Sequence, residues 1–418
     1  MKNKKILIIG DLRGASNWGA QLTSNALINW FNEKYKNADF KYLTEKSWIE
    51  NTPKGGFRKK GNNSFNLLKW YVKKLLWHIG ILTAIGFSKQ KITNTENLNK
   101  LSKQEDSIPD NFHEFEGYWK KMLRGEILEY ENNLLNWADE IFINSEGSIV
   151  NHDKKFKRYR RSGRFNLFIA WVAKSKYQKK TSIINHTFDP RHNDIENIAM
   201  NVYPILDKVL IREKLSLENV NRIIPENKNI EFFPDFAYTS IKNKKTKLTK
   251  KIICVGDSAG FKSVDWDIYK FYDQLFAFLH AKNFSIIFAD GNSEKQRVFG
   301  DLYYKYKFKW LHPTSHNPKQ LSRYLAASNL FISGRWHASI LSLINETPVI
   351  LFGSDSLKVK ALNNLYGDIF PYFPIENLDK SIDEIKAMTM NMIKNNSTKK
   401  KITNINHNMK KYFDIEKL

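Results

Sequence analysis

The sequence predicts an α/β protein made of two Rossmann-like domains that face each other across a cleft. Three observations lead to this prediction. Short apolar segments alternate with helical patterns, polar or glycine-rich residues follow these segments, and a charged run divides the chain past its middle. Strands that alternate with helices form parallel sheets. With 418 residues the chain is too long for one ordinary domain and fits two of roughly 200 residues each.

The first domain is expected to begin with an apolar strand over residues 4–10, followed by a helix over about 22–31. Further strands are expected over residues 140–144, 181–185 and 208–211, and polar residues come directly after each of them. The carboxyl ends of parallel strands share one edge of a sheet, and open α/β sheets bind their ligands beyond that edge. The polar residues that follow these strands are therefore candidates for a site.

The second domain is expected to hold strands over residues 251–255, 285–289, 330–333 and 348–352. A helix over 336–344 joins the last two strands, and this strand–turn–helix–strand order is typical of a parallel sheet. The same pattern thus occurs in both halves of the chain, which is why two similar domains are predicted.

The turn before this helix carries Ser333, Gly334, Arg335 and His337. At the N-terminus of a helix, backbone N–H groups without partners and the helix dipole favour an anion. A fixed cation and an imidazole beside such a terminus predict a phosphate or carboxylate ligand. The alternative is that Arg335 and His337 only make surface hydrogen bonds.

The charged run over residues 242–251 is predicted to separate the two domains. The first domain then covers residues 1–243, with an insertion at about 50–135, and the second covers 250–375. Residues 376–418 are predicted to be helical and are candidates to pack back on the first domain.

The segment over residues 64–87 is apolar at helical spacing, and lysines and tryptophans are set among its apolar positions. Its lysines argue against a helix that spans a membrane. Two interpretations stay open: a helix that lies on an anionic membrane surface, and an amphipathic helix packed on the domain or on a second subunit. The residues concerned are Lys69, Trp70, Lys73, Lys74 and Trp77.

The net charge of +24 favours an anionic partner. No nucleic-acid motif is present and the basic residues are spread along the chain, so a phosphorylated substrate or an anionic membrane surface is expected rather than nucleic acid. The single cysteine, Cys254, lies in an apolar strand and excludes a disulfide within the chain. No signal peptide is apparent at the N-terminus. We predict a cytoplasmic protein that could lie at the inner face of the membrane.

Neither a metal nor a bound cofactor is expected. His312 and His316 have the spacing of a helical ligand pair, but Pro313 and Pro318 break the helix that such a pair needs. The glycines that follow the first strand are too few for a dinucleotide fingerprint, and a Walker-type phosphate loop is absent.

Several of these motifs together resemble the polysaccharide pyruvyl transferase family. They occur in the expected order over roughly residues 5–366, and the most specific is the segment that holds Arg335 and His337. The chain departs from the family pattern at Trp336, where an aliphatic residue is usual, and at residues 50–135. The matching pieces are Asn17-x-Gly-Ala, Glu146-Gly-Ser, Ile211-Arg-Glu-x-x-Ser216, Pro234-Asp235, Ser333-Gly-Arg-Trp-His337, Pro348-Val-Ile and the lysine-bearing loop 354–360.

The resemblance implies a GT-B-like arrangement of the two domains and ketal pyruvyl transfer. In that reaction, phosphoenolpyruvate is the donor substrate and a sugar of a bacterial surface polysaccharide, or of its lipid-linked precursor, is the acceptor. Two alternatives stay open. One is a nucleotide-sugar-dependent glycosyltransferase of cell-envelope polysaccharide synthesis, and the other is a non-catalytic sugar-binding protein with the same fold.

For such a donor, Arg212 and Arg335 are the candidates to bind its phosphate and carboxylate, since guanidinium groups match these oxygens bidentately. Ser333 and Gly334 are expected beside them. His337 is expected to hold the phosphate or to act as general acid, and Glu146 is the preferred base. For Glu146 a helix-capping role is the alternative. Candidates for acceptor binding or for supporting contacts are Asp11, Asn17, His186 and Asp189.

Overall fold

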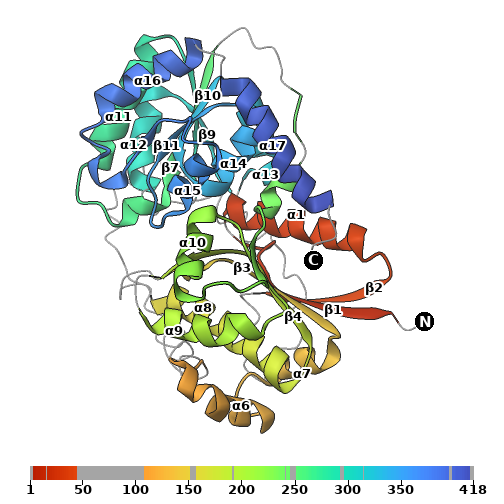
Figure 1. Ribbon diagram of the computed structural model, residues 1–418. Coiled ribbons are helices and arrows are strands. Elements are labelled where there is room, and N and C mark those ends of the chain that lie inside the picture. Colours follow the sequence, from red (N-terminus) through yellow and green to blue (C-terminus); the bar gives the residue numbers. More distant parts are fainter. Residues whose placement is uncertain are drawn as a thin grey trace, which may run out of the picture.

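Two parallel sheets, each with helices on both faces, form the two domains of the protein (Figure 1). The predicted fold class is thereby confirmed. The segment 64–87, with its two interpretations, lies outside the described residues. The computed structural model describes residues 3–15, 17–44, 108–150, 157–190, 193–240, 242–244, 251–291, 296–313, 315–394 and 398–414.

The first sheet has the strand order β2-β1-β3-β4-β5-β6, and all of its neighbouring strands run parallel. In β1, Ile6 and Ile8 belong to one buried core and Leu7 and Ile9 to another. Alternate side chains of a strand point to opposite faces, so both faces of this sheet are covered. The strands are β1 (Lys4–Asp11), β2 (Ala38–Thr44), β3 (Glu140–Val150), β4 (Lys180–Asp189), β5 (Lys208–Ile211) and β6 (Ile230–Phe232).

Helix α1 (Trp18–Lys34) covers the face of the first sheet that holds Ile6 and Ile8, where its Leu27 and Phe31 are buried. Its first turn is capped by Asn17, whose side-chain oxygen accepts a hydrogen bond from the Ala20 N–H at 2.8 Å. Within the described part of this domain, the other helices are α6 (Phe115–Leu123), α7 (Glu129–Trp137), α8 (Lys157–Trp171), α9 (Asn193–Val202) and α10 (Lys214–Ile223).

The second sheet has the order β12-β11-β10-β7-β8-β9 and is also parallel. Cys254 is buried in β7, as its apolar neighbours predict. The strands are β7 (Ile252–Ser258), β8 (Ser285–Ala289), β9 (Lys309–Leu311), β10 (Leu330–Gly334), β11 (Val349–Phe352) and β12 (Tyr372–Phe373). The helices are α11 (Ile268–Ala281), α12 (Gln296–Tyr306), α13 (Pro318–Ala327), α14 (Trp336–Ile344), α15 (Lys358–Leu365), α16 (Ile382–Lys394) and α17 (Thr398–Asp414).

Short helical turns join several of these elements. Among them, η5 follows β6 and leads toward the second domain, so that its first residues lie near both sheets. The turns are η1 (Phe112–Glu114), η3 (Val172–Lys176), η4 (Tyr203–Ile205), η5 (Phe236–Thr239), η6 (Ala259–Lys262) and η7 (Ile375–Asn377).

The C-terminal helix α17 lies against the first domain, beside α1 (Figure 1). The ring of Phe413 meets Phe233 and Phe236 edge-on, at centroid distances of 4.9 and 5.3 Å. Trp30 of α1 donates its indole N–H to the Phe413 carbonyl at 3.3 Å. These contacts bury aromatic surface between the domains, which fixes how their sheets face each other.

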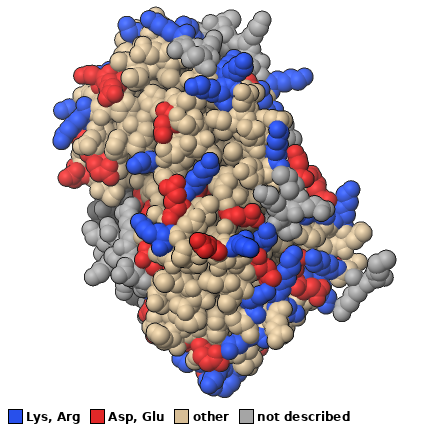
Figure 2. All heavy atoms as spheres, in the orientation of Figure 1, with Lys and Arg blue, Asp and Glu red and all other residues tan. Residues whose placement is uncertain are grey.

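Lysine and arginine side chains are spread over the visible face of the molecule, with acidic side chains among them (Figure 2). Within the described ranges, no helix is both long enough and apolar enough to cross a membrane.

Candidate functional site

A cleft of about 580 Å³ lies between the two domains. It is lined by residues at the carboxyl ends of β1, β3, β5 and β10, and by the first turns of α1, α14 and α15. Ligands of open parallel sheets bind at this edge. The side chains and backbone that carry the site's chemistry come from Asp11, Asn17, Glu146, Arg212, Gly334, Arg335, His337 and Lys358.

One carboxylate oxygen joins the two domains at the base of this cleft. Asp235, just before η5, accepts hydrogen bonds at Oδ2 from Arg212 Nη1 at 2.9 Å, Trp336 Nε1 at 3.0 Å and His337 Nε2 at 3.2 Å. Burial opposes ionisation of Asp235, but the charges of His337 and Arg212 and these hydrogen bonds hold its pKa well below its usual range. Asp235 is therefore an anion that orients groups from both domains.

Arg212 leaves the end of β5 and is almost fully buried. Thr187 Oγ1 accepts hydrogen bonds from its Nε at 3.1 Å and its Nη2 at 3.0 Å, and Glu213 Oε1 accepts one from Nε at 3.0 Å. Its Nη1 lies 3.3 Å from His337 Nε2. A single donor site requires Arg212 of the first domain and His337 of the second to lie on the same cleft, and the structure places them in contact. Burial opposes its charge, yet Glu213 and Asp235 raise the pKa of Arg212, so it stays a cation.

Arg335 is the N-cap residue of α14, and Asp257 at the end of β7 holds its guanidinium. Nε donates to Asp257 Oδ1 at 2.7 Å and Nη2 donates to Oδ2. Burial disfavours the charge, but Asp257 outweighs it and raises the pKa of Arg335. One edge of the guanidinium is thus occupied by a protein carboxylate. A donor anion can therefore bind only the remaining N–H groups of the Arg335 guanidinium. The bidentate contact that the sequence predicts cannot use the edge that Asp257 occupies.

Ser333 and Gly334 position Arg335. The Ser333 hydroxyl is buried; it donates to the Asp257 carbonyl at 3.0 Å and accepts from the Arg335 N–H at 3.1 Å. A Cβ on Gly334 would come within 2.4 Å of Ser258 Oγ, so glycine lets β10 approach β7 here. The Ser333 hydroxyl thus positions Arg335, and the place of Ser333 beside the donor stays a prediction.

Glu146 lies within β3 at a left-handed φ of 42°, next to an irregularity in the pairing of β3 with β4. Its Oε1 is buried and has no hydrogen-bond partner among the described residues. Burial raises its pKa, and the nearby His337 and Arg212 offset only part of that rise. A buried carboxyl with a raised pKa, in a cleft that arginine and lysine also line, is suited to proton transfer.

The four remaining candidates from the sequence are not among the residues that contact Asp235. Asp11 pairs bidentately with Arg13 at the cleft, with Nη2 to Oδ2 at 2.8 Å, and Asn17 caps α1. His186 is buried within β4, and neither of its ring nitrogens has a hydrogen-bond partner in the described part of the chain. Asp189 accepts from the Leu357 N–H at 3.0 Å, so it anchors the loop before α15 to the first domain.

Sequence reasoning did not select Asp235, Asp257 or Lys358 as site residues. Each lies near a strand end or on the lysine-bearing loop. Their positions in the sequence therefore match the pattern from which the other site residues were predicted. Lys358, the first residue of α15, lines the cleft, and its Nζ lies 3.4 Å from Asp355 Oδ1. Carboxylates that hold cations are harder to select than the cations, because many strand ends carry an aspartate.

His186 should make the stability of the protein depend on pH. Burial, followed by the charge of Arg212, lowers its pKa from 6.5 to about 3. Between these pH values the unfolded chain takes up a proton that the folded protein does not, so the free energy of unfolding falls as the pH falls. From pH 7.5 to 5.5 this loss should be about 1.4 kcal/mol.

Urea unfolding of His186→Phe at these two pH values tests the expectation. The variant should lose less stability than the wild type by that amount, whereas the exposed control His113→Phe should behave like the wild type. An equal loss in wild type and His186→Phe would show that His186 is not buried in its neutral form.

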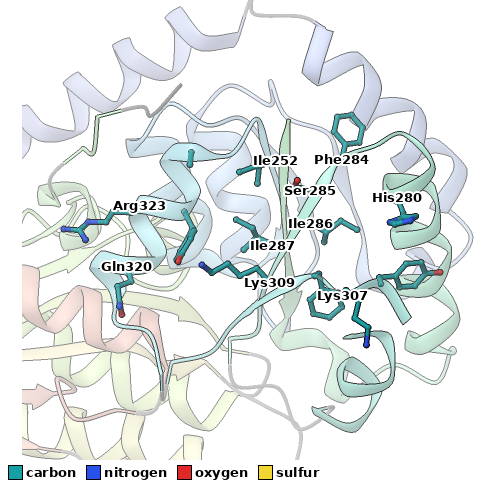
Figure 3. A pocket seen from close by; sticks show the side chains of 14 residues that line it. Ile252, His280, Phe284, Ser285, Ile286, Ile287, Lys307, Lys309, Gln320 and Arg323 are labelled. Atoms are coloured by element: carbon teal, nitrogen blue, oxygen red, sulfur yellow. The ribbon is translucent and has the colours of Figure 1, made fainter. Parts of the chain in front are cut away.

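A second cavity of about 740 Å³ lies at the amino ends of β7, β8 and β9 (Figure 3). Figure 3 shows Arg323 and His280 at its opposite ends, with Lys309 between them. Lys309 and Arg323 are exposed to solvent. This cavity is at the edge of the sheet opposite to the interdomain cleft, so the cleft is the candidate active site. Among the described residues, no group of three His, Cys, Asp or Glu could hold a metal ion.

Comparison with known proteins gives one family and several structural likenesses. A family model described as polysaccharide pyruvyl transferase matches residues 17–356. No curated protein matches the sequence. The fold is similar to that of a putative UDP-N-acetylglucosamine 2-epimerase from Listeria monocytogenes, with a TM-score of 0.54 and 8% identity over 96% of this chain and 91% of that one.

Two further solved structures are similar over nearly the whole chain. One is the UDP-GlcNAc 2-epimerase from Methanocaldococcus jannaschii, with a TM-score of 0.50, 13% identity, and coverage of 96% of this chain and 99% of that one. The other is the glycosyltransferase of kitacinnamycin, with a TM-score of 0.51, 10% identity, and coverage of 99% and 96%. At such low identity these likenesses show the fold alone, which is GT-B-like as predicted.

Proposed function

The chain belongs to the polysaccharide pyruvyl transferase family, and on this premise we propose that it transfers the pyruvyl carbons of phosphoenolpyruvate to two hydroxyls of one sugar. The acceptor would be a sugar of a bacterial surface polysaccharide or of its lipid-linked precursor. The observation that carries the proposal is the contact of Arg212 and His337 through Asp235, which places hydrogen-bond donors of both domains in one cleft.

Phosphoenolpyruvate carries a phosphate and a carboxylate, so its site needs several positive groups. Arg212, Arg335 and Lys358 line the cleft. The first turn of α14 adds backbone N–H groups, since no side chain caps this helix. Protein carboxylates already offset part of the positive charge of Arg212 and Arg335. Lys358 and the N-terminus of α14 are therefore proposed to supply much of the attraction for the donor.

The reaction adds one proton to the donor and removes one from each of two sugar hydroxyls. The methylene carbon C3 takes a proton and becomes the methyl group, while one hydroxyl oxygen bonds to C2. The bond from C2 to the phosphate oxygen then breaks, and its electron pair leaves with the phosphate. A second hydroxyl oxygen bonds to C2 and completes the cyclic ketal. Of the two hydroxyl protons released, one balances the proton gained at C3 and the other leaves with the phosphate or solvent.

Glu146 and His337 are proposed to move these protons. The raised pKa of Glu146 favours the protonated carboxyl, which suits a donor of the C3 proton. Once deprotonated, Glu146 can act as the base toward a sugar hydroxyl, the role preferred from the sequence. His337, oriented by Asp235, is proposed to hold the phosphate and to assist its departure.

Phosphoenolpyruvate should raise the melting temperature of the protein, because a ligand that binds only the folded state stabilises it by mass action. At a hundred times its Kd the gain is about 2.7 kcal/mol. A panel of nucleotide sugars, measured in the same way, should give no shift.

A shift with a nucleotide sugar and none with phosphoenolpyruvate would contradict the proposal and favour the glycosyltransferase alternative. The non-catalytic alternative is separated by phosphate release: binding of phosphoenolpyruvate without any release of phosphate in the presence of glycan acceptors would support it.

Gly19 of α1 should be needed for activity, because it lies directly against the His337 ring. A Cβ at this position would come within 2.3 Å of Nδ1 and 3.1 Å of Cγ. The ring is held on Asp235, so it cannot move away without losing that hydrogen bond. Gly19→Ala should lower kcat/KM at least tenfold, which corresponds to about 1.4 kcal/mol.

Gly117→Ala is the matched control, since Gly117 is also helical and a Cβ there would meet nothing within 4 Å. Both variants gain the same helix propensity, so a difference in phosphate release reports the contact with His337. Wild-type activity in Gly19→Ala would show that the domains can separate at no cost to the reaction.

A further inference from the structure

Two serines and an asparagine form a hydrogen-bonded cluster in the first-domain wall of the cleft. Ser145 Oγ lies 2.6 Å from Ser148 Oγ. Asn166 of α8 donates its side-chain N–H groups to Ser148 Oγ at 2.9 Å and to Ser145 Oγ at 3.2 Å. Ser145 and Asn166 are buried, and all three residues line the cleft beside Glu146.

The local backbone brings these three side chains together. Glu146 adopts its left-handed φ between the two serines, and the pairing of β3 with β4 shifts just after it. On the neighbouring helix, a Cβ at Gly163 would come within 2.6 Å of the Ser148 carbonyl oxygen, so glycine lets α8 approach β3 here. The left-handed backbone of Glu146 costs stability, and strained backbone of this kind is typical of ligand sites.

The hydrogen bonds within the cluster leave some of its donor and acceptor groups unused. The two serine hydroxyls carry two protons, and the bond between them uses one. The amide of Asn166 donates to both oxygens, so it supplies N–H groups and does not take up the second hydroxyl proton. Within the described residues, that proton and the Asn166 amide oxygen have no protein partner. One donor and one acceptor without formal charge match a hydroxyl group, which both donates and accepts.

We propose that Ser145, Ser148 and Asn166 bind a hydroxyl group of a neutral hexose, the acceptor of the transfer. The proposal rests on the proposed function and names the acceptor class of the same site. Glu146 lines the same cleft as the cluster, and its carboxyl is proposed to take the proton of a hydroxyl bound there. Arg212 and His337 would hold the donor at the base of the cleft, so that the two substrates meet across Glu146.

The proposal differs from the sequence-based selection of Asp11, Asn17, His186 and Asp189 for the acceptor. Asp11 pairs with Arg13, Asn17 caps α1, Asp189 accepts from Leu357 and His186 is buried in β4. The cluster presents uncharged groups, so a phosphorylated or carboxylated sugar would find no cation there to compensate it.

Saturation-transfer NMR with neutral methyl hexosides tests the proposal. The probes are the methyl glycosides of glucose, galactose and mannose and their 2-acetamido counterparts, each added to protein saturated with phosphoenolpyruvate. At least one probe should bind the wild type, and Ser148→Ala and Asn166→Leu should each weaken its binding by roughly tenfold or more, because a neutral hydrogen bond is lost. Asn136→Ala, at an exposed position of α7, is the control that should bind like the wild type.

Both cluster variants should keep the wild-type thermal shift with phosphoenolpyruvate, which also shows that they fold. Binding of no hexoside to the wild type would overturn the proposal, as would equal binding to wild type and both variants. Failure of the proposed function is a different result: phosphoenolpyruvate then gives no thermal shift to the wild type at all.

Discussion

Replacing Arg212 with lysine should lower kcat/KM for phosphoenolpyruvate by roughly thirtyfold to several-thousandfold. The guanidinium of Arg212 contacts Thr187, Glu213 and Asp235 at the same time and faces the cleft. An ammonium cannot reproduce this fork, and loss of a buried charge-assisted contact costs on the order of 2–5 kcal/mol. Phosphate release with glycan acceptors measures the effect, and the exposed Arg222→Lys on α10 is the matched control.

Arg212→Ala should also destabilise the fold. Removal of the cation leaves Glu213 and Asp235 buried without their partner, and breaking such a pair typically costs about 3–5 kcal/mol. Arg212→Lys keeps a cation there, so it is the variant that separates catalysis from folding. Wild-type kcat/KM in a stable Arg212→Lys protein would contradict a donor site at Arg212.

Glu146→Gln should lower kcat by about 10²–10⁴-fold, the usual contribution of general acid–base catalysis. The affinity for phosphoenolpyruvate, measured by thermal shift, should not fall, since glutamine has nearly the same shape and adds no negative charge to a cleft that binds an anion. The matched control is Glu131→Gln on α7, another buried carboxyl, whose pKa burial raises to about 7 outside the cleft.

The same substitution should stabilise the protein near neutral pH. The folded-state pKa of Glu146 is raised, so the folded protein binds this proton more tightly than the unfolded chain. Stability is then lost as the pH rises from the ordinary carboxyl pKa through the raised one. Glutamine carries no such proton and avoids this loss. A Glu146→Gln protein that keeps wild-type kcat would contradict the proposed proton transfer.

The sequence predicts much of the fold, because each element has a local signature. The apolar strand over 208–211 and the helix over 336–344 have the predicted bounds. Strands β3 and β4 run on to Val150 and Asp189, well past their predicted ends. The residues that directly follow the predicted ends, Ser145 and Glu146 in β3 and His186 and Thr187 in β4, are polar. Burial of polar side chains depends on tertiary partners that the local pattern does not contain.

Within the site, the cations are easier to predict than their partners. Arg212, Arg335 and His337 follow strand ends, the edge at which open α/β sheets bind their ligands. That Asp235 binds Arg212 and His337 depends on how two domains meet, which no local pattern encodes. The same holds for His186: its position after a predicted strand suggests a ligand, but β4 continues and buries it.

A crystal structure of the protein with phosphoenolpyruvate tests most directly whether the two domains share one donor site. We expect the donor to lie in the interdomain cleft. One of its anionic groups should contact Arg212 and the other should contact the first turn of α14, near His337. Phosphoenolpyruvate bound to a single domain, or in the cavity at the amino ends of β7, β8 and β9, would contradict the account.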